Sequence, residues 1–503
     1  MKFHILTFGC QMNYADSARI RAVLQHCWFS YTEDIKAANI VIFETCSIKQ
    51  KSEDKITGKL KEIRPDQKIW ITGCMIQHNF RSWKLLKKGR GSSSAARELP
   101  HFQQGNFIGS LNTHKPEILG ITNDEIEHRD IRSASRDTVF VNHAFNPLFH
   151  KLQQKWKNLE LFRRIDDTWF LPLMLEKLWY SVMYEWTFIN EYEKILPESI
   201  TSMNAHTSTA YVPISTGCNQ FCAYCIVPYA RGLEKYFPVE QIVEEVKTHL
   251  ARGAKEIVLL GQIVNKHPQF VEIIKAILPL EGLTWLRYTS PYPTYYTPEL
   301  LALHETEEKL CPHIHMPLQS GSDAVLKRMF RGYTVAQAKK FIDDVSALKR
   351  DISITTDIIV WFSGETEEDF QQTLELIEYG KFDMIYIGIY SSRPGTLAQK
   401  KYADDVSREV KRDRWNRLNE VLKRISTENN EKEVGHKLTM LVNEIRAWNG
   451  KRWTDNDMFI NGYADNMKQI TCNVKRVTCK VWDFVKVKVV KGIAFKLYGE
   501  IEE

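Results

Sequence analysis

The chain has 503 residues, 43% of them hydrophobic and 26% charged, which is typical of a globular protein with roughly three or four domains. No stretch approaches the roughly 20 apolar residues of a membrane-spanning helix, and the N-terminus lacks the basic start and small-residue cleavage motif of a signal peptide. These features favour a soluble, cytoplasmic protein. In that reducing compartment, the ten cysteines are expected to be ligands or free thiols rather than a disulfide framework.

The N-terminal part alternates short strand patterns with helical stretches. Three apolar runs rich in β-branched residues, KFHILTFGC, NIVIFETCS and KIWITGCM, are separated by helical patterns at 16–27 and 52–64. This alternation predicts a parallel sheet covered by helices. Each run ends at a cysteine, and ligands bind at the carboxyl ends of strands in open α/β sheets. We therefore expect a metal site made by Cys10, Cys46 and Cys74, the alternative being three small buried side chains.

The region 115–203 differs in character from its neighbours. It follows a loop-like GSSSAAR segment and the strand-like run NFIGS, and its residues 142–200 have a helical pattern with four tryptophans. We expect these tryptophans to form the core of a small helical module. A surface that binds a partner or stacks on bases is the alternative.

From residue 204 to 435, strand and helix patterns alternate again. Three of the helical patterns lie at 238–252, 335–350 and 367–379. The six strand-like runs are AYVPIS, EIVLLGQ, LTWLRYTS, HIHMPLQSG, ISITTDIIVWF and MIYIGIYSS. Six strands in this rhythm predict a partial (β/α)6 barrel of the TIM type, with its reactive centre at the carboxyl ends of the strands.

A cysteine-rich loop, STGCNQFCAYCIVPYARGLE, follows the first of these strands. Its thiols, Cys218, Cys222 and Cys225, have C-x3-C-x2-C spacing, which allows them to bind one compact metal centre. A structural zinc site would normally need a fourth Cys or His at matching spacing, and the next cysteine, Cys311, is 86 positions further on. Three thiolates instead favour an iron-sulfur cluster. A cubic four-iron cluster held by three cysteines leaves one iron open to a cofactor.

Residues 436–503 change to a β pattern. The runs KLTMLVNEI, QITCNVKRV, FVKVKVVK and AFKLYGEI predict a small β-barrel. Residues 437–503 hold 12 Lys or Arg against 8 Asp or Glu, so net +4 of the chain's +6 lies here. In the third run Lys486 and Lys488 alternate with valines, which turns the ammonium groups outward, where RNA phosphates would be accessible. A solvated face is the alternative.

Several motifs occur in order along the chain. The Cys218–Cys225 loop has Tyr224 before its last cysteine, and FGCQMNYADS, FETCSIKQKSEDK and ITGCMIQ surround the N-terminal cysteines. Further blocks are GQIVN, RYTSPYP, HMPLQSGSD, TTDIIVWFSGETEEDF and YSSRPGT. Together they resemble the radical S-adenosylmethionine (SAM) methylthiotransferases, and the terminal β region resembles a TRAM domain, an RNA-binding barrel. The resemblance covers nearly all of the chain apart from roughly 115–203.

The resemblance implies an α/β protein with four regions. They are an N-terminal open parallel-sheet methylthiotransferase domain (1–114), a family-atypical, largely helical insertion rich in aromatic residues (115–203), a radical SAM partial barrel (204–435) and a TRAM-like barrel (436–503). QMN after Cys10, TCSIK around Cys46 and GQIVN resemble the tRNA-modifying branch. The implied activity adds a methylthio group to C2 of an N6-isopentenyl-type adenosine next to the tRNA anticodon. That carbon is inert to acid–base chemistry, so radical chemistry is needed.

The implied cofactors are SAM and two [4Fe-4S] clusters. The cluster on Cys218, Cys222 and Cys225 would bind SAM and cleave it to methionine and a 5′-deoxyadenosyl radical that takes hydrogen from the adenine. The other cluster would carry or supply the sulfur, which a second SAM methylates. Its ligands would be Cys10, Cys46 and Cys74.

Further residues are expected to contact the cofactor or line the cavity. They are Tyr224, Arg231, Glu234, Gln262, Asn265, Ser290, Gln319, Ser320 and Asp357. The alternatives are packing of the loop by Tyr224, a structural ion pair made by Arg231 or Glu234, and strand-end capping by the others. The expected RNA contacts are Arg393, Lys451, Arg452, Lys486 and Lys488.

The sequence also departs from the family blocks. Trp361 and Ser363 stand where the family has glycine and proline, Tyr292 where a histidine is frequent, and Ile263 where asparagine is usual. We expect the indole of Trp361 to change the local packing and to narrow the pocket.

The expected partners are a tRNA anticodon stem-loop, an electron donor such as flavodoxin or ferredoxin, and a sulfur source. We expect a monomer without membrane partners. Two other functions stay open. The enzyme could act on a different adenosine modification or on a ribosomal protein side chain, or the chain could be a non-catalytic RNA-binding protein that keeps a cluster.

Overall fold

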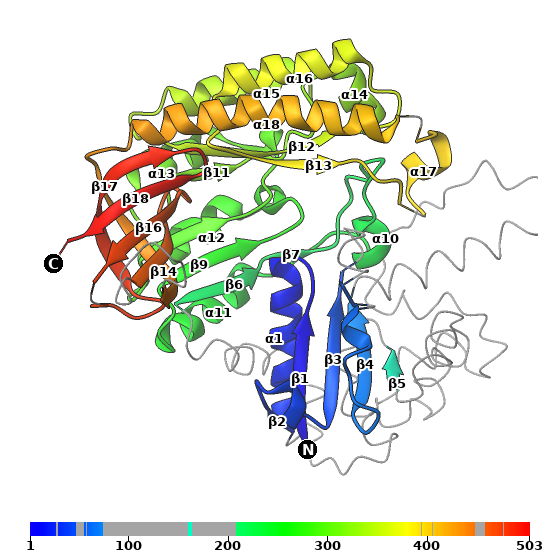
Figure 1. Ribbon diagram of the computed structural model, residues 1–503, viewed down its shortest axis with the longest axis vertical. Coiled ribbons are helices and arrows are strands. Elements are labelled where there is room, and N and C mark those ends of the chain that lie inside the picture. Colours follow the sequence, from blue (N-terminus) through cyan, green and yellow to red (C-terminus); the bar gives the residue numbers. More distant parts are fainter. Residues whose placement is uncertain are drawn as a thin grey trace, which may run out of the picture. The chain divides into compact units, whose positions relative to one another are not determined.

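The protein is described by a computed structural model (Figure 1). The described residues are 1–26, 29–46, 55–56, 58–73, 159–162, 208–393, 395–404, 406–447, 458–475 and 477–502. They form two compact units, one of residues 1–8 and 23–189 and the other of residues 9–22 and 190–503. Within the described part of the chain, every helix is too short or too polar to span a bilayer.

The first unit contains a five-stranded parallel sheet in the order β2-β1-β3-β4-β5. Its strands are β1 (Lys2–Thr7), β2 (Ser30–Tyr31), β3 (Ile40–Thr45), β4 (Lys68–Gly73) and β5 (Leu159–Phe162). Every residue of β3 is buried, as expected for a central parallel strand whose two faces are both covered. The predicted parallel sheet and its first three strand-like runs are confirmed.

Strand β5 lies where we expected helix. Residues 159–162 fall inside the predicted helical insertion, but they pair in parallel with β4 between Ile69 and Ile71. The reason is local, because LELF alternates apolar and acidic residues with the period of two that favours a strand. The rest of the insertion, with its tryptophans, and the predicted strand NFIGS lie outside the described residues.

The second unit contains six parallel strands in two sheets, ordered β10-β9-β6 and β11-β12-β13. A single parallel bridge between Leu286 and Leu310 continues the pairing from one sheet toward the other. The strands are β6 (Thr209–Pro213), β9 (Glu256–Leu260), β10 (Trp285–Tyr288), β11 (His313–His315), β12 (Ser353–Val360) and β13 (Met384–Ile389). All six predicted strands are confirmed, and they form the predicted partial barrel.

Helices α10 to α16 lie between these strands in the chain, and α17 and α18 follow β13 (Figure 1). They are α10 (Val227–Arg231), α11 (Val239–Ala251), α12 (Phe270–Ile277), α13 (Pro298–Thr306), α14 (Asp323–Arg328), α15 (Val335–Ser346), α16 (Glu367–Gly380), α17 (Leu397–Lys401) and α18 (Arg408–Glu431). Thr334 and Thr366 start α15 and α16 with capping boxes, in which the threonine side chain accepts from the N3 backbone while the N3 side chain binds the threonine N–H. Helix α1 (Gln11–His26) begins in the second unit, with residues 11–22.

Side chains alternate between the two faces of β12. Ile354, Ile358 and Val360 belong to the hydrophobic cluster that includes Phe341 of α15 and Phe370 of α16. The odd-numbered residues between them point to the opposite face, as the period of two requires. That face is the interior of the half-barrel.

The C-terminal strands close a five-stranded barrel in the order β14-β15-β16-β18-β17. They are β14 (Lys437–Ala447), β15 (Met458–Ala464), β16 (Gln469–Val474), β17 (Phe484–Ile493) and β18 (Lys496–Ile501). The barrel is confirmed, but we predicted only four of its strands, because the glycine and asparagine in MFINGYA weaken the strand pattern of β15. Along β17, Val487 and Val489 are buried and Lys486 and Lys488 are exposed, as predicted.

This barrel packs against the amino-terminal ends of the half-barrel strands, within the second unit. Trp285, the first residue of β10, meets Phe484 with ring centroids 4.6 Å apart. Glu256, the first residue of β9, accepts a hydrogen bond from the hydroxyl of Tyr463 at 2.7 Å. The carboxyl ends of the strands, at the opposite edge, are thereby left for the functional site.

Candidate functional site

The cysteine loop runs between β7 (Ser215–Thr216) and α10, beyond the carboxyl end of β6. The backbone N–H of Cys218 donates to the carbonyl of Gly232 at 3.1 Å, which closes the loop on itself. Gly217 allows this closure, because it has φ +72° and a Cβ there would lie 2.0 Å from the carbonyl oxygen of Leu233. The thiols therefore lie where a barrel of this type keeps its reactive centre.

Each of the three cysteine sulfurs accepts a hydrogen bond from an N–H group. The backbone N–H groups of Gln220 and Val227 donate to Cys218 Sγ at 3.5 Å and to Cys225 Sγ at 3.4 Å. Arg331 Nη1 donates to Cys222 Sγ at 3.5 Å. Hydrogen bonds of this kind stabilise thiolates and help to set the reduction potential of iron-sulfur clusters.

Burial raises the pKa of the Cys218 thiol to about 11 and that of Cys225 to about 12. Both thiols therefore stay protonated at neutral pH unless a metal binds and displaces the protons. Among the described residues, no three His, Cys, Asp or Glu side chains gather as ligands of a single metal ion. Three reduced cysteines in a loop with N–H donors at each sulfur fit a larger group, an iron-sulfur cluster.

Arg331 is a residue of this site that sequence reasoning missed. Its guanidinium contacts two aromatic rings, 4.6 Å from the centroid of Tyr292 and 5.2 Å from that of Tyr333. Its Nη2 donates to the carbonyl of Pro317 at 2.8 Å, which holds Nη1 toward Cys222. The sequence signal was weak, because Arg331 is 109 positions from Cys222 and stands in a short loop.

Tyr292, one of the departures from the family blocks, connects the cysteine loop to the Arg331 segment. Its hydroxyl accepts from the backbone N–H of Gly332 at 2.8 Å and from Gln220 Nε2 at 3.2 Å. Asn265 holds its backbone on both sides, donating to its carbonyl at 3.0 Å and accepting its N–H at 2.8 Å. Asn265 therefore positions the backbone at Tyr292.

Tyr292→Phe is expected to lower the free energy of unfolding by about 1–2 kcal/mol, because it leaves the Gly332 N–H without its acceptor. Denaturant unfolding of the two proteins measures this loss. Tyr295→Phe, whose hydroxyl makes no hydrogen bond with a described residue, is the control. Equal stability of Tyr292→Phe and wild type would contradict the role of the hydroxyl.

Arg231 and Glu234 both form ion pairs. Arg231 Nη2 lies 2.6 Å from Asp16 Oδ2, with both side chains buried, and residue 16 belongs to the same compact unit. Glu234 Oε2 lies 2.6 Å from Lys266 Nζ. Tyr224 packs edge-on against Phe362, with centroids 6.4 Å apart. SAM contact by these residues stays a prediction.

Most of the predicted strand-end residues lie beyond the carboxyl ends of the strands, but Asp357 lies within β12, three residues before its end. Gln262 and Ser290 follow β9 and β10. Gln319 exchanges backbone hydrogen bonds with Asp357 and Ile359 at 2.8 and 2.9 Å, and the Ser320 hydroxyl lies 3.4 Å from that of Thr373.

Asp357 faces the barrel interior. Its Oδ2 lies 3.3 Å from His315 Nε2, on the neighbouring strand β11. Asp357 supplies the one carboxylate among the predicted strand-end residues, and its contact with a ligand stays a prediction.

Trp361 lies in the hydrophobic core, and narrowing of the pocket by its indole stays a prediction. The ring is fully buried in the same hydrophobic cluster as Ile358 and Val360. The residue has φ +69°, a conformation that suits the glycine of the family block and costs a larger residue roughly 1–2 kcal/mol. Burying an indole is worth about 3–5 kcal/mol, which outweighs that strain. Ser363 is buried beside it in the chain.

The N-terminal cysteines follow three adjacent parallel strands. Cys46 comes directly after β3 and is buried, and Cys10 comes three residues after β1. Cys74, directly after β4, lies outside the described residues. The meeting of the three thiols at one cluster therefore stays a prediction.

The predicted RNA contacts are in different surroundings. Lys486 and Lys488 are exposed on β17, and Lys486 Nζ donates to Thr439 Oγ1 at 2.7 Å. Arg393 is mostly buried in the turn before α17, where its carbonyl accepts from the Thr396 hydroxyl at 2.7 Å. Lys451 and Arg452 lie outside the described residues.

Comparison with known proteins identifies the family. Residues 212–377 match the radical SAM superfamily, and residues 2–91 match the uncharacterized protein family UPF0004. A tRNA-2-methylthio-N(6)-dimethylallyladenosine synthase from Herpetosiphon aurantiacus is 32% identical over 485 residues, covering 92% of this chain and 92% of the relative. The chain belongs to this synthase family. A synthase of the same name from Carboxydothermus hydrogenoformans is 31% identical and covers 99% of this chain and 98% of its own length.

Among solved structures, the radical SAM methyltransferase TsrM from Kitasatospora setae matches with a TM-score of 0.46 at 10% identity, over 90% of this chain and 79% of TsrM. We predicted a radical SAM enzyme of the tRNA methylthiotransferase type, and membership of the synthase family confirms this prediction. Membership of the superfamily implies a [4Fe-4S] cluster and SAM. The cysteine loop supplies thiols that fit that cluster.

Proposed function

We propose that this protein adds a methylthio group to C2 of an N6-isopentenyl-type adenosine next to the anticodon of tRNA. The observation that carries the proposal is the loop of Cys218, Cys222 and Cys225, with an N–H directed at each sulfur, beyond the first strand of a six-stranded half-barrel. The near full-length similarity to synthases of that name supports the choice of substrate.

The three thiols would hold a [4Fe-4S] cluster, which supplies the electron that cleaves SAM into the radical that takes the C2 hydrogen. The protein's own part is to orient SAM and the adenosine and to exclude water from the radical. The rings of Tyr292 and Tyr333 and the guanidinium of Arg331 cover Cys222 on one side. The Asp357 carboxylate, next to His315 on β11, would accept a hydrogen bond from SAM or from the adenine amino group.

A second cluster on Cys10, Cys46 and Cys74 would carry the sulfur. Its support is the position of these cysteines after three neighbouring strands of one parallel sheet. The reaction also needs an electron donor such as flavodoxin or ferredoxin and a sulfur source. The expected working form is a monomer bound to the anticodon stem-loop.

Mass spectrometry of tRNA nucleosides tests the proposal. Cells that lack the gene should lose 2-methylthio-N6-isopentenyladenosine and accumulate the precursor without the methylthio group. The wild-type gene should restore the product, and a Cys222→Ala gene should not. An unchanged nucleoside profile would overturn the tRNA substrate and favour a protein side chain or another adenosine.

Anaerobic reconstitution tests the cofactors. Two clusters predict about eight irons per chain, and a Cys46→Ala variant should keep about four. About four irons in the wild type would contradict the second cluster. A failure to cleave SAM under reduction would instead favour the non-catalytic RNA-binding protein.

A further inference from the structure

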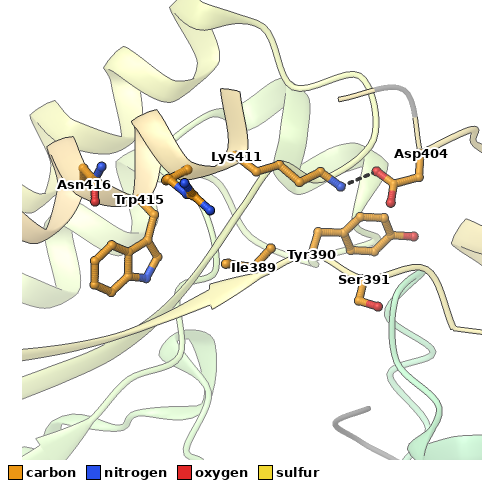
Figure 2. A pocket seen from close by; sticks show the side chains of 8 residues that line it. Ile389, Tyr390, Ser391, Asp404, Lys411, Trp415 and Asn416 are labelled. Atoms are coloured by element: carbon orange, nitrogen blue, oxygen red, sulfur yellow. Dashed lines mark hydrogen bonds and ion pairs between the residues drawn. The ribbon is translucent and has the colours of Figure 1, made fainter. Parts of the chain in front are cut away.

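A cavity of about 670 Å³ opens between the end of β13 and the first half of α18. Figure 2 shows Lys411 extending from the helix toward Asp404, and Trp415 projecting from the same helix on the side of Ile389, the last residue of β13. Its size falls within the roughly 300–1,000 Å³ of pockets that hold small organic groups. It lies at the carboxyl end of β13, and the cysteine loop likewise follows the carboxyl end of β6.

Apolar and aromatic side chains form one part of the cavity wall, and polar and charged side chains form the rest. Ile389 is 56% exposed on β13, the edge strand of its sheet, and the indole of Trp415 is partly exposed. Tyr390 is buried and its ring is fixed against Phe362, with centroids 5.1 Å apart. An exposed aliphatic side chain opposite an indole forms a surface on which a flat ring can stack.

The rim of the cavity is positively charged. Asp404, the one acid among its described lining residues, is neutralised by Lys411, with Oδ1 and Nζ 2.6 Å apart. Arg412 lines the cavity, and it makes no salt bridge with any residue in the described part of the chain. The nearby Arg414 and Arg417 are held by Glu367 at 3.2 and 2.6 Å. Arg412 is therefore the lining cation that can bind a phosphate without breaking a salt bridge to a described residue.

We propose that this cavity, the β13–α18 pocket, binds one nucleotide of the substrate tRNA's anticodon loop. This inference rests on the proposed function. The base would stack on Trp415 against Ile389, and Arg412 would bind a neighbouring phosphate. An aromatic face beside an unpaired cation is the combination by which proteins hold single-stranded nucleic acid. An adenosine that enters the half-barrel must leave its loop neighbours at the carboxyl ends of the strands, where this pocket opens.

Fluorescence anisotropy of the holoenzyme with a labelled anticodon stem-loop that carries N6-isopentenyladenosine tests the pocket. Trp415→Ala should weaken binding by about 5- to 150-fold, the range found for one lost base stack. Arg412→Ala should weaken it and make the dependence of log K on log salt shallower by about 0.7, the loss of one phosphate contact. Lys423→Ala is the control, because Lys423 pairs with Glu420 and lies about 16 Å further along α18.

Iron content and thermal unfolding identify a variant that fails to fold. Arg412 is exposed, so Arg412→Ala tests the pocket even if Trp415→Ala unfolds. Wild-type affinity and salt slope in a folded Arg412→Ala protein would overturn the pocket, while the methylthio product in the nucleoside assay would still uphold the proposed function. Slower reduction of Arg412→Ala by flavodoxin at unchanged RNA affinity would also overturn it, since the face would then bind an acidic protein.

Discussion

Glu256→Ala is expected to lower the free energy of unfolding by about 3–5 kcal/mol, the usual cost of leaving one partner of a buried ion pair alone. Glu256 Oε1 lies 2.7 Å from Arg287 Nε, and both side chains are almost completely buried. Its Oε2 accepts from Thr209 Oγ1 at 2.6 Å and from the hydroxyl of Tyr463 at 2.7 Å. Alanine at position 256 would remove the acceptor of all three donors at once.

The same change should loosen the C-terminal barrel from the half-barrel. Arg287 also donates to the carbonyls of Ala464 and Asp465, at 2.9 and 2.5 Å, so the Glu256 network fixes the guanidinium that holds the end of β15. Without Glu256 this guanidinium is a buried, uncompensated charge. We therefore expect the two barrels to unfold in separate steps rather than together.

Denaturant unfolding followed by circular dichroism, together with limited proteolysis, measures both effects. Glu281→Ala, a change at an exposed glutamate, is the control. In the double variant Glu256→Leu with Arg287→Met, the buried charge is removed from both sides, and much of the lost stability should return. A loss below about 1 kcal/mol in Glu256→Ala would show that the network is not a support of the interface.

The alternation of residues predicted most of the fold. All six half-barrel strands were predicted from short runs of β-branched residues, because a strand covered by helices has a continuous apolar run in the sequence. The local spacing of Cys218, Cys222 and Cys225 likewise located the loop of the functional site. Strand β15 and the left-handed conformation of Trp361 did not follow from local pattern, since pairing and burial elsewhere in the barrels stabilise them.

The groups that surround the thiols could not be predicted from spacing. Arg331 and Tyr292 come from loops far along the chain, and only the closure of the half-barrel brings them to the cysteine loop. Arg231 shows the same limit, because its match to a family motif left open whether it binds a cofactor or an acid. Its partner Asp16 is 215 positions away.

Arg331→Met is expected to shift the reduction potential of the bound cluster to more negative values, by up to about 130 mV. The guanidinium donates to Cys222 Sγ, and a positive donor stabilises the reduced, more negative state of a cluster. A hydrogen bond to a charged group is worth about 1.5–3 kcal/mol, and about 59 mV corresponds to a tenfold change for one electron. Methionine keeps a similar volume against the rings of Tyr292 and Tyr333 but removes the donor.

A redox titration followed by electron paramagnetic resonance, made on a protein whose N-terminal cysteines are replaced by alanine, measures this potential alone. Arg331→Lys keeps the charge but loses the planar fork that binds Cys222 and Pro317 together, so an intermediate shift is expected. Arg328→Met is the control, because Arg328 pairs with Asp369 at 3.1 Å. Arg331→Met could keep its iron and shift the reduction potential no more than Arg328→Met does. In that case the guanidinium supports the loop mechanically and does not tune the cluster.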